Sequence, residues 1–381
     1  MLERYRMGKL RAISGHMALV ALLALSASLI AAGPNEARAQ SADVFTIGGI
    51  EIDTTGENDL DAKRTGVAEA KAQAFSDLIA RLTLEGTQDQ LAVPSPDRLE
   101  FLIRDVTFDQ EKFGGGRYLA ELTVRFQPEA VRDLLQREGI AFAETKSRPL
   151  AVVPILQQPS GNSVLWGGAN PWMAAWVEAP PAQGLVPVLA PIGDLDDIAA
   201  IDARMALGGD KGALGAYAGR YEAGGAVVAQ AQPSGNGSAM TVSVMVSAPG
   251  WDPVSTVLSV QGGTGEEAET IYQRGVAAVI ALLEEEWTRA NLLRYDRAAT
   301  VLAIRVPLAG LQDLVAVRGA LEGAPPVKRV KLTRVTTGEA DMDIEFVGDI
   351  YQLQTALVQG GLTLDLSDDA TSWLVRRAPG G

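Results

Sequence analysis

The sequence offers few side chains for acid–base or nucleophilic chemistry. Its 381 residues include no cysteine and a single histidine, His16, which lies within a predicted secretion signal. The mature chain therefore cannot carry Ser-His-Asp or Cys-His catalysis, and it cannot build zinc sites from imidazole or thiolate ligands. Carboxylates, lysine, tyrosine, hydroxyl groups and the backbone remain. We predict no metal and no cofactor, because the sequence has neither an EF-hand loop nor a P-loop.

The best candidates for a functional surface follow two short apolar runs, PLAVVPIL (149–156) and GLVPVLAPI (184–192). Such runs are typical of strands that are buried on both faces of a parallel sheet. If the two strands are parallel, the loops after them emerge at one edge of the sheet, where open α/β sheets bind ligands. The sequence therefore predicts a ligand- or partner-binding surface at this edge. Its candidate residues are Trp166, Asn170, Trp172, Asp194 and Asp197.

Most of these residues also fit a structural role. Asn170 precedes a proline, which is the pattern of a helix N-cap followed by proline at the first helical position. Trp172 shares a helix face with the tryptophan four residues later, so both can pack on a core. Asp194 is typical of an N-cap, and Asp197 would lie in the positive first turn of the same helix. Trp166 precedes any predicted helix, which leaves it as the residue with the strongest case for binding.

Other acidic groups are weaker candidates. Asp341, Asp343 and Glu345 alternate with apolar residues, so we expect them on one solvated face of a strand. The glutamates at 284–286 occupy consecutive helix positions and do not converge, so we expect them to be solvated as well. A hydrolase that works through carboxylates alone would need two of them facing each other across a cleft, roughly 5 to 9.5 Å apart.

The first segment, 40–146, alternates elements of clear type. A strand is expected at 44–53, a helix at 58–82, a hairpin at 101–126 and a helix at 128–140. The helix at 58–82 carries apolar residues at helical spacing, and the hairpin turns at three consecutive glycines. The predicted order is β-α-β-β-α.

The last segment, 297–377, predicts the same order with one further strand. Its expected elements are a strand (300–307), a helix (308–323), a hairpin (327–348) and a helix followed by a strand (349–366). We therefore predict two related α+β modules of split β-α-β type, one on each side of the middle segment. A chance match is the alternative, because β-β-α runs are common.

The middle segment, 147–294, has a different composition, with apolar strands, many glycines and alanines, and helices between the strands. It begins β-α-β-α, which predicts an α/β domain with a mixed sheet whose first two strands are parallel. Three helices are expected at 170–179, 194–207 and 212–223, three strands at 226–232, 240–248 and 253–261, and a closing helix at 266–293. The whole chain is predicted to be an α/β and α+β multidomain protein.

The first 39 residues have the pattern of a secretion signal: basic residues, an apolar run, and small residues before a cleavage point after Ala39. An uncleaved amino-terminal anchor is the alternative. The mature chain has no second long apolar run, so we expect a periplasmic protein without stable membrane insertion. The net charge of −14 argues against binding to nucleic acid or to anionic lipid.

Several motifs occur in an order that resembles a known family. They are LTVRFQPEAVRDLLQREGIAFAETKSRP (122–149), SRPLAVVPIL (147–156), LWGGANPWMAAW (165–176) and GLVPVLAPIGDLDDIAAID (184–202). Together they resemble proteobacterial secreted proteins of domain of unknown function 2066. The resemblance implies a periplasmic protein and supplies no catalytic residues. The middle segment also resembles, at the level of fold alone, the amino-terminal α/β domain of the Tol system's periplasmic propeller protein.

Three functions remain open at this point. The first is a non-catalytic periplasmic protein that binds another cell-envelope component, which the modular build and the missing histidine and cysteine favour. The second is a protein that binds a small molecule or a glycan through the tryptophan loop at 163–180, because aromatic faces stack on sugars and on cations. The third is a carboxylate-only hydrolase.

Overall fold

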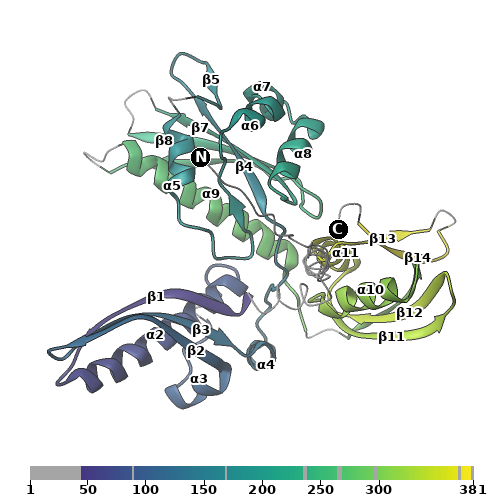
Figure 1. Ribbon diagram of the computed structural model, residues 1–381, viewed down its shortest axis with the longest axis horizontal. Coiled ribbons are helices and arrows are strands. Elements are labelled where there is room, and N and C mark those ends of the chain that lie inside the picture. The colour runs from purple at the N-terminus through teal and green to yellow at the C-terminus, as the bar shows by residue number, and fades with distance from the viewer. Residues whose placement is uncertain are drawn as a thin grey trace, which may run out of the picture.

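Three sheets organise the chain, and each is built from the strands of one of the three predicted segments (Figure 1). The computed structural model describes residues 44–87, 90–167, 170–234, 238–263, 268–295, 298–367 and 370–378. The predicted secretion signal lies outside these residues. The fold is multidomain and mixes α/β with α+β architecture, as the sequence predicts. Within the described ranges, no helix combines the length and the apolar character that a membrane span requires.

The first module has the predicted split β-α-β arrangement. Its elements are β1 (Thr46–Thr55), α2 (Asp59–Leu82), α3 (Pro96–Leu102), β2 (Ile103–Gly114), β3 (Arg117–Phe126) and α4 (Pro128–Arg137). Strand β3 lies between β1 and β2 and is antiparallel to both, so β1 and β2 are parallel to each other. Helix α2 begins at Asn58, whose side chain accepts from two backbone N–H groups, and packs a buried face that includes Ala74 and Leu78 on the sheet.

The last module repeats this strand order. Its elements are β10 (Thr300–Pro307), α10 (Leu311–Gly323), β11 (Val327–Val335), β12 (Glu339–Phe346), α11 (Ile350–Gln359), β13 (Leu362–Leu366) and β14 (Trp373–Arg377). Strand β12 lies between β10 and β11 and is antiparallel to both, as β3 is in the first module. Strand β14, which was not predicted from the sequence, joins β13 to the free side of β10.

The central domain holds a mixed sheet with the strand order β5-β4-β7-β8-β9, and β6 pairs with β4 off this path. Its elements are β4 (Leu150–Gln157), β5 (Ser163–Val164), α5 (Pro171–Glu178), β6 (Val188–Leu189), α6 (Leu195–Ala200), α7 (Ala203–Leu207), α8 (Lys211–Arg220), β7 (Gly225–Pro233), β8 (Ala239–Ser247), β9 (Ser255–Gln261) and α9 (Ala268–Asn291). Helices α5 and α9 cover one face of the sheet, and α6, α7 and α8 cover the other (Figure 1).

Two central elements differ from their predicted form. The strand expected at 184–192 is reduced to Val188–Leu189, because the preceding backbone N–H groups bind a side chain of α9 rather than a neighbouring strand. The helix expected at 194–207 is split into α6 and α7. Asp202 causes the break, since its Oδ1 accepts from the N–H of Met205 at 2.7 Å and starts a second helix.

The three units meet where α9 ends. Phe142, which follows α4, bridges to Leu293, which follows α9, and each N–H donates to the other's carbonyl. Gln352 of α11 donates to the carbonyl of Leu292 at 2.8 Å. The apolar core of the first module is continuous with the core beneath α9, whereas the last module has a core of its own.

Candidate functional site

The structure brings the two predicted loops together at one edge of the central sheet. Strands β4 and β6 pair in parallel, with Leu150 opposite Val188, so the loops after them leave the sheet at the same edge, as predicted. The backbone of Gly193, in the loop after β6, lies against the side chains of Met173 and Trp166. Gly193 has a φ of +74°, which favours glycine, and a side chain there would collide with Met173.

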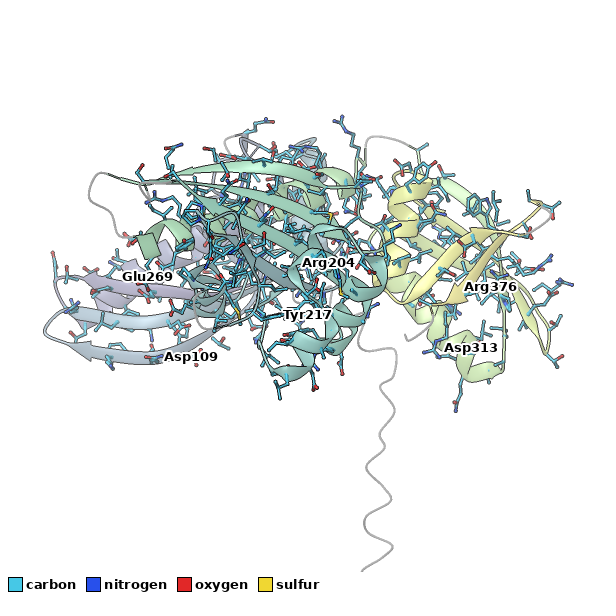
Figure 2. The ribbon with its side chains drawn as sticks, turned by 90° about the horizontal axis from the view of Figure 1, so that it is seen from above. Asp109, Arg204, Tyr217, Glu269, Asp313 and Arg376 are labelled. Carbon is cyan, nitrogen blue, oxygen red and sulfur yellow. The ribbon has the colours of Figure 1, made fainter. Side chains whose placement is uncertain are left out.

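Trp166 is half-buried and anchors its own loop. Its indole Nε1 donates to the carbonyl of Ile201 at 2.7 Å, and its ring centroid lies 6.1 Å from that of Tyr217. Tyr217 is fully buried on α8, on the same side of the sheet as Arg204 of α7 (Figure 2). The indole N–H of Trp166 is therefore already hydrogen-bonded within the protein, and only the exposed part of the ring can contact a ligand.

Asn170 and Trp172 fasten α5 to the sheet. Asn170 Oδ1 accepts from the N–H of Met173 at 3.1 Å, and its Nδ2 donates to two buried carbonyls, each at 3.0 Å. Trp172 is fully buried and donates through Nε1 to the carbonyl of Ala229 at 2.9 Å. Trp176 packs against it in a T-shaped pair, with the ring centroids 5.6 Å apart. Asn170 is therefore the N-cap of α5, and Trp172 and Trp176 form the helix face that packs on the core.

Asp197 is fully buried and supports the loop after β6. Its Oδ2 accepts from the N–H of Gly193 at 2.8 Å and from the hydroxyl of Tyr221 at 2.6 Å, and its Oδ1 accepts from Arg220 Nε at 2.9 Å. The Tyr221 hydroxyl also accepts from the N–H of Ile192 at 2.8 Å. Burial, together with the hydrogen bond to the Asp197 carboxylate, raises the pKa of Tyr221. These bonds fix the backbone from Ile192 to Asp197.

Asp194 caps α6 and shares Arg220 with Asp197. Its Oδ1 accepts from the N–H of Asp197 and from Arg220 Nη2, both at 2.9 Å. The N–H of Asp197, together with Arg220, holds the pKa of Asp194 below its usual value. Arg220 Nη1 also lies 3.1 Å from the carboxylate of Asp196. Asp194 and Asp197 thus bind one guanidinium, which is not the arrangement that a carboxylate-only hydrolase requires.

The network of Asp197, Tyr221 and Arg220 supports three exposed aliphatic side chains. Ile192 is 68% exposed, Leu195 is 82% exposed and Ile198 is 48% exposed. Leu195 and Ile198 are three residues apart on α6 and share one face of the helix. We call Ile192, Leu195 and Ile198 the exposed apolar cluster. It lies at the edge of the sheet where the sequence predicts a binding surface.

The residues predicted from the sequence are the supporting residues of this surface, and the exposed ones were not predicted. The tryptophan, asparagine and aspartate residues were chosen because they follow the two predicted parallel strands, and the aliphatic residues of the same loops were not considered. The spacing of Ile192, Leu195 and Ile198, three residues apart in a stretch with four aspartates nearby, was the signal that could have identified them. A helix of six residues with so many charges cannot bury all of its aliphatic side chains.

Other acidic groups of the middle and last segments have structural contacts. Glu284 was expected to be solvated, and this prediction is wrong: it is half-buried, and its carboxylate oxygens accept from the N–H groups of Leu185 and Val186, both at 2.9 Å. Burial raises the pKa of Glu284. Asp341 lies on the outer face of β12, as predicted, where its carboxylate is 2.8 Å from Arg334.

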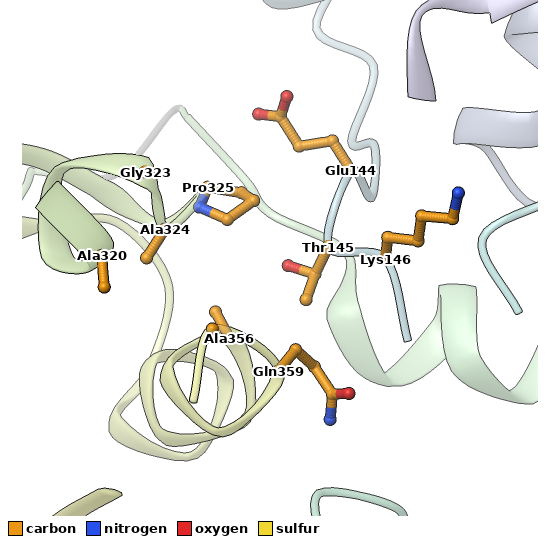
Figure 3. Close-up of a pocket in the computed structure, with 10 residues that line it drawn as sticks. Glu144, Thr145, Lys146, Ala320, Gly323, Ala324, Pro325, Ala356 and Gln359 are labelled. Atoms are coloured by element: carbon orange, nitrogen blue, oxygen red, sulfur yellow. The ribbon is translucent and has the colours of Figure 1, made fainter. Parts of the chain in front are cut away.

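Several cavities lie away from this edge. An open groove of about 530 Å³ runs between α2, α3 and β2, and its lysines, Lys63 and Lys71, are each 2.6 Å from a glutamate. A smaller cavity of about 40 Å³ lies between Thr145 and the helices of the last module (Figure 3). That volume holds a few water molecules. Beside it, Gln359 accepts from the N–H of Arg148 at 2.6 Å, so this space belongs to the junction between units.

Comparison of the chain with protein-family models and with curated proteins returned no match. The family resemblance, the secretion signal and the periplasmic location therefore remain predictions from the sequence.

Proposed function

We propose that this chain is a non-catalytic periplasmic protein that binds another cell-envelope protein through the exposed apolar cluster. The observation that carries the proposal is the rigid support beneath exposed aliphatic side chains. Ile192 and Leu195 point into solvent from a backbone that a buried carboxylate, a tyrosine hydroxyl and a guanidinium hold in place. A surface fixed before binding loses little conformational entropy when a partner covers it.

The comparison with α10 supports this choice of surface. Helix α10 also begins with an exposed leucine, Leu311 at 75%, followed by the exposed Val315. Its N-cap is Gly310, which has no side chain to cap the first turn, and the hydrogen bond from the N–H of Ala309 to Asp313 is exposed. The same kind of apolar side chain is therefore present on α10 without the buried polar support that α6 receives. Large exposed apolar groups mark interaction sites most clearly where they are contiguous and held in place.

The chemistry around the cluster indicates the kind of partner. Asp194, Asp196 and Asp202 carry exposed or half-exposed carboxylates beside it, and the side chain of Asp196 is 79% exposed. Arg220 and Arg204 neutralise only part of this charge. A complementary partner would present an apolar patch bordered by lysine or arginine, and salt would slow its association.

Affinity capture from envelope extracts tests the proposal with two matched variants. Leu195→Ser and Leu311→Ser each remove an exposed leucine from the first position of a helix, and each should change the stability by less than about 0.5 kcal/mol. We expect Leu195→Ser to reduce capture of the partner by about 30-fold, the effect of losing a central interface side chain. We expect Leu311→Ser to leave capture unchanged. Equal capture by both variants and the wild type would overturn the proposal.

A further inference from the structure

The outer edge of β9 is open for pairing. Strand β9 is the last strand on one side of the central sheet, and among the described residues no further strand pairs with its outer side. Its antiparallel register with β8 places Val254 opposite Val246 and Gly262 opposite Ser238, and both pairs are hydrogen-bonded. Hydrogen-bonded pairs alternate along an antiparallel ladder.

This alternation fixes which backbone groups point outward. Residues 256, 258 and 260 direct their N–H and C=O groups to β8. Ser255, Val257 and Ser259 direct theirs away from it. These three residues also have exposed side chains, whereas Leu258 and Val260 pack beneath α9. Arg274 of α9 donates to the carbonyl of Gln261, which closes the edge at that end. The free edge is therefore the short run 255–259.

The other long edges of the described sheets carry protection that β9 lacks. Strand β11 has four basic residues in nine positions, and β2 is interrupted at Gln110, which has a φ of +56°. A shifted register between Ile47 and Ile50 interrupts β1. Charges and bulges are the usual means by which proteins block pairing at sheet edges. The sequence of β9, STVLSVQ, has no charge, no proline and no break in its register.

The run 255–259 is complementary to itself. In an antiparallel pair centred on Val257, that residue faces its own copy, Ser255 faces Ser259, and Thr256 faces Leu258. In such a pair Val257 contacts Val257 and Ser255 contacts Ser259 of the second copy, and no two side chains of like charge lie opposite each other. A two-fold interface requires this kind of self-complementarity. The net charge of −14 makes a neutral strip the surface on which two copies repel each other least.

We propose that the chain forms a two-fold symmetric dimer by antiparallel pairing of β9 with β9 of a second copy, centred on Val257. The dimer joins the two six-stranded central sheets into one continuous sheet. The pairing uses the outward N–H and C=O groups of Ser255, Val257 and Ser259. The exposed apolar cluster lies on other elements, so the dimer leaves it free and is independent of the proposed function.

Disulfide trapping tests the register, because the natural chain contains no cysteine. In the full-length protein, Val257→Cys places two thiols on directly opposed residues about 5.5 Å apart at Cα, within disulfide range. Ser259→Cys, on the same edge, places them about 14 Å apart, because each lies two residues from the two-fold axis. After mild oxidation we expect about tenfold more covalent dimer from Val257→Cys than from Ser259→Cys.

Sedimentation of the unmodified protein is the second measurement. We expect a monomer–dimer equilibrium that Val257→Lys shifts to monomer, since it places two lysines opposite each other. Thr241→Lys, on the exposed face of β8, is the matched control and should leave the dimer intact. A wild-type protein that remains monomeric, or equal trapping by the two cysteine variants, would overturn the proposal. A monomeric wild type would point to a strand from a different protein as the occupant of this edge.

Discussion

Asp197 shows how one residue can define a surface that it does not itself form. Its carboxylate is fully buried and accepts from a backbone N–H, a tyrosine hydroxyl and a guanidinium. A buried carboxylate is tolerated only when its oxygens are paired and hydrogen-bonded. Here the result of that pairing is a fixed loop from which Ile192 and Leu195 project into solvent. Asp197 is therefore a positioning residue for the proposed interface.

The Tyr221→Phe variant tests this positioning role. It removes the hydroxyl that accepts from Ile192 and donates to Asp197, while every apolar side chain of the cluster is kept. We expect the free energy of unfolding to fall by about 1 to 2 kcal/mol, since the variant leaves a buried acceptor with one bond fewer. We also expect weaker partner capture, because the loop is less rigid. Urea unfolding and capture from extracts measure the two effects.

The Tyr295→Phe variant is the control. Tyr295 is also a half-buried tyrosine next to a buried carboxylate, that of Glu144. It differs from Tyr221 in its position, because it lies at the junction of the three units. The control variant should affect stability without affecting capture. If Tyr221→Phe lowers stability and leaves capture at the wild-type level, the loop does not need its rigid support, and the positioning role is wrong.

Glu284 provides a prediction with a defined pH dependence. Burial raises its pKa, so the folded protein binds this proton more tightly than the unfolded chain does. Its contribution to the free energy of unfolding is therefore present below about pH 4.3 and falls as the pH rises through the raised pKa. The E284Q variant lacks this titration. We expect the wild type to lose stability relative to E284Q between pH 4 and the raised pKa, measured by urea unfolding at each pH. A constant difference would contradict the raised pKa.

Residue types alone identified part of the site. Asn170 and Asp194 were predicted as N-caps, and both accept the backbone N–H groups expected of that role. The partners of Asp197 could not be predicted, because Arg220 and Tyr221 lie more than 20 residues away and reach it only through the packing of α8 against α6. Glu284 was misjudged for the same reason: its backbone partners are about 100 residues earlier in the chain.

At the scale of elements, α5 depends on its N-cap residue, Asn170. The short helix has eight residues, and Asn170 both caps it and binds two buried carbonyls. A helix of this length is not stable alone, so its position comes from the cap and from Trp172 and Trp176 packed on the sheet. The tryptophan-rich stretch thus acts chiefly as an attachment between α5 and the core.

Two cap substitutions separate these contributions. Asn170→Ala should lower the free energy of unfolding by about 2 to 3 kcal/mol, because it removes a cap and leaves buried carbonyls without donors. Asp202→Ala removes a cap that makes one exposed hydrogen bond, to the N–H of Met205, and should lower it by about 0.5 to 1 kcal/mol. Thermal or urea unfolding compares the two. Equal losses would show that the side-chain amide of Asn170 contributes nothing beyond the cap.

Helices and strands with strong periodicity were predicted well, and so was the short helix α5, whereas β6, α6 and α7 were not. Helix α2 was expected at 58–82 and is observed at Asp59–Leu82. The predicted parallel pairing of β4 with β6 is confirmed, but β6 has only two paired residues because Glu284 binds the backbone before it. Helices α6 and α7 were merged in the prediction, since the cap at Asp202 resembles any other polar position within a helix.

At the scale of the whole molecule, the last module is the most independent part. Its core is separate from the core that joins the first module to the central domain. Its contacts with the rest of the chain include the hydrogen bonds from Gln352 to the carbonyl of Leu292 and from the N–H of Arg148 to Gln359. Units joined by such small polar contacts unfold with limited coupling.

We therefore expect two thermal transitions in calorimetry. Leu353→Ala removes a fully buried leucine from the core of the last module and should destabilise that module by about 3 kcal/mol. The variant should lower the midpoint of one transition and leave the other nearly unchanged. Leu283→Ala, at a fully buried leucine of α9, should shift the other one. A single transition that both variants lower equally would contradict independent units.

The division into three segments could be predicted from composition and element order. Two β-α-β-β-α patterns flank a middle segment whose first two predicted strands, unlike theirs, are short and almost entirely apolar. The continuity of the first and central cores could not be predicted. It arises from packing between segments far apart in sequence, such as the connections that hold Phe142 and Leu293, which are 151 positions apart.

We expect a partner protein to cover the exposed apolar cluster. Site-specific photo-crosslinking in the producing cells tests this most directly, with the photoreactive residue placed at Leu195 or, as the matched control, at Leu311. We predict one reproducible crosslinked protein at Leu195, lost when Ile198→Asp is added, and none of the same mass at Leu311. No crosslink at Leu195, or the same products at both positions, would contradict it.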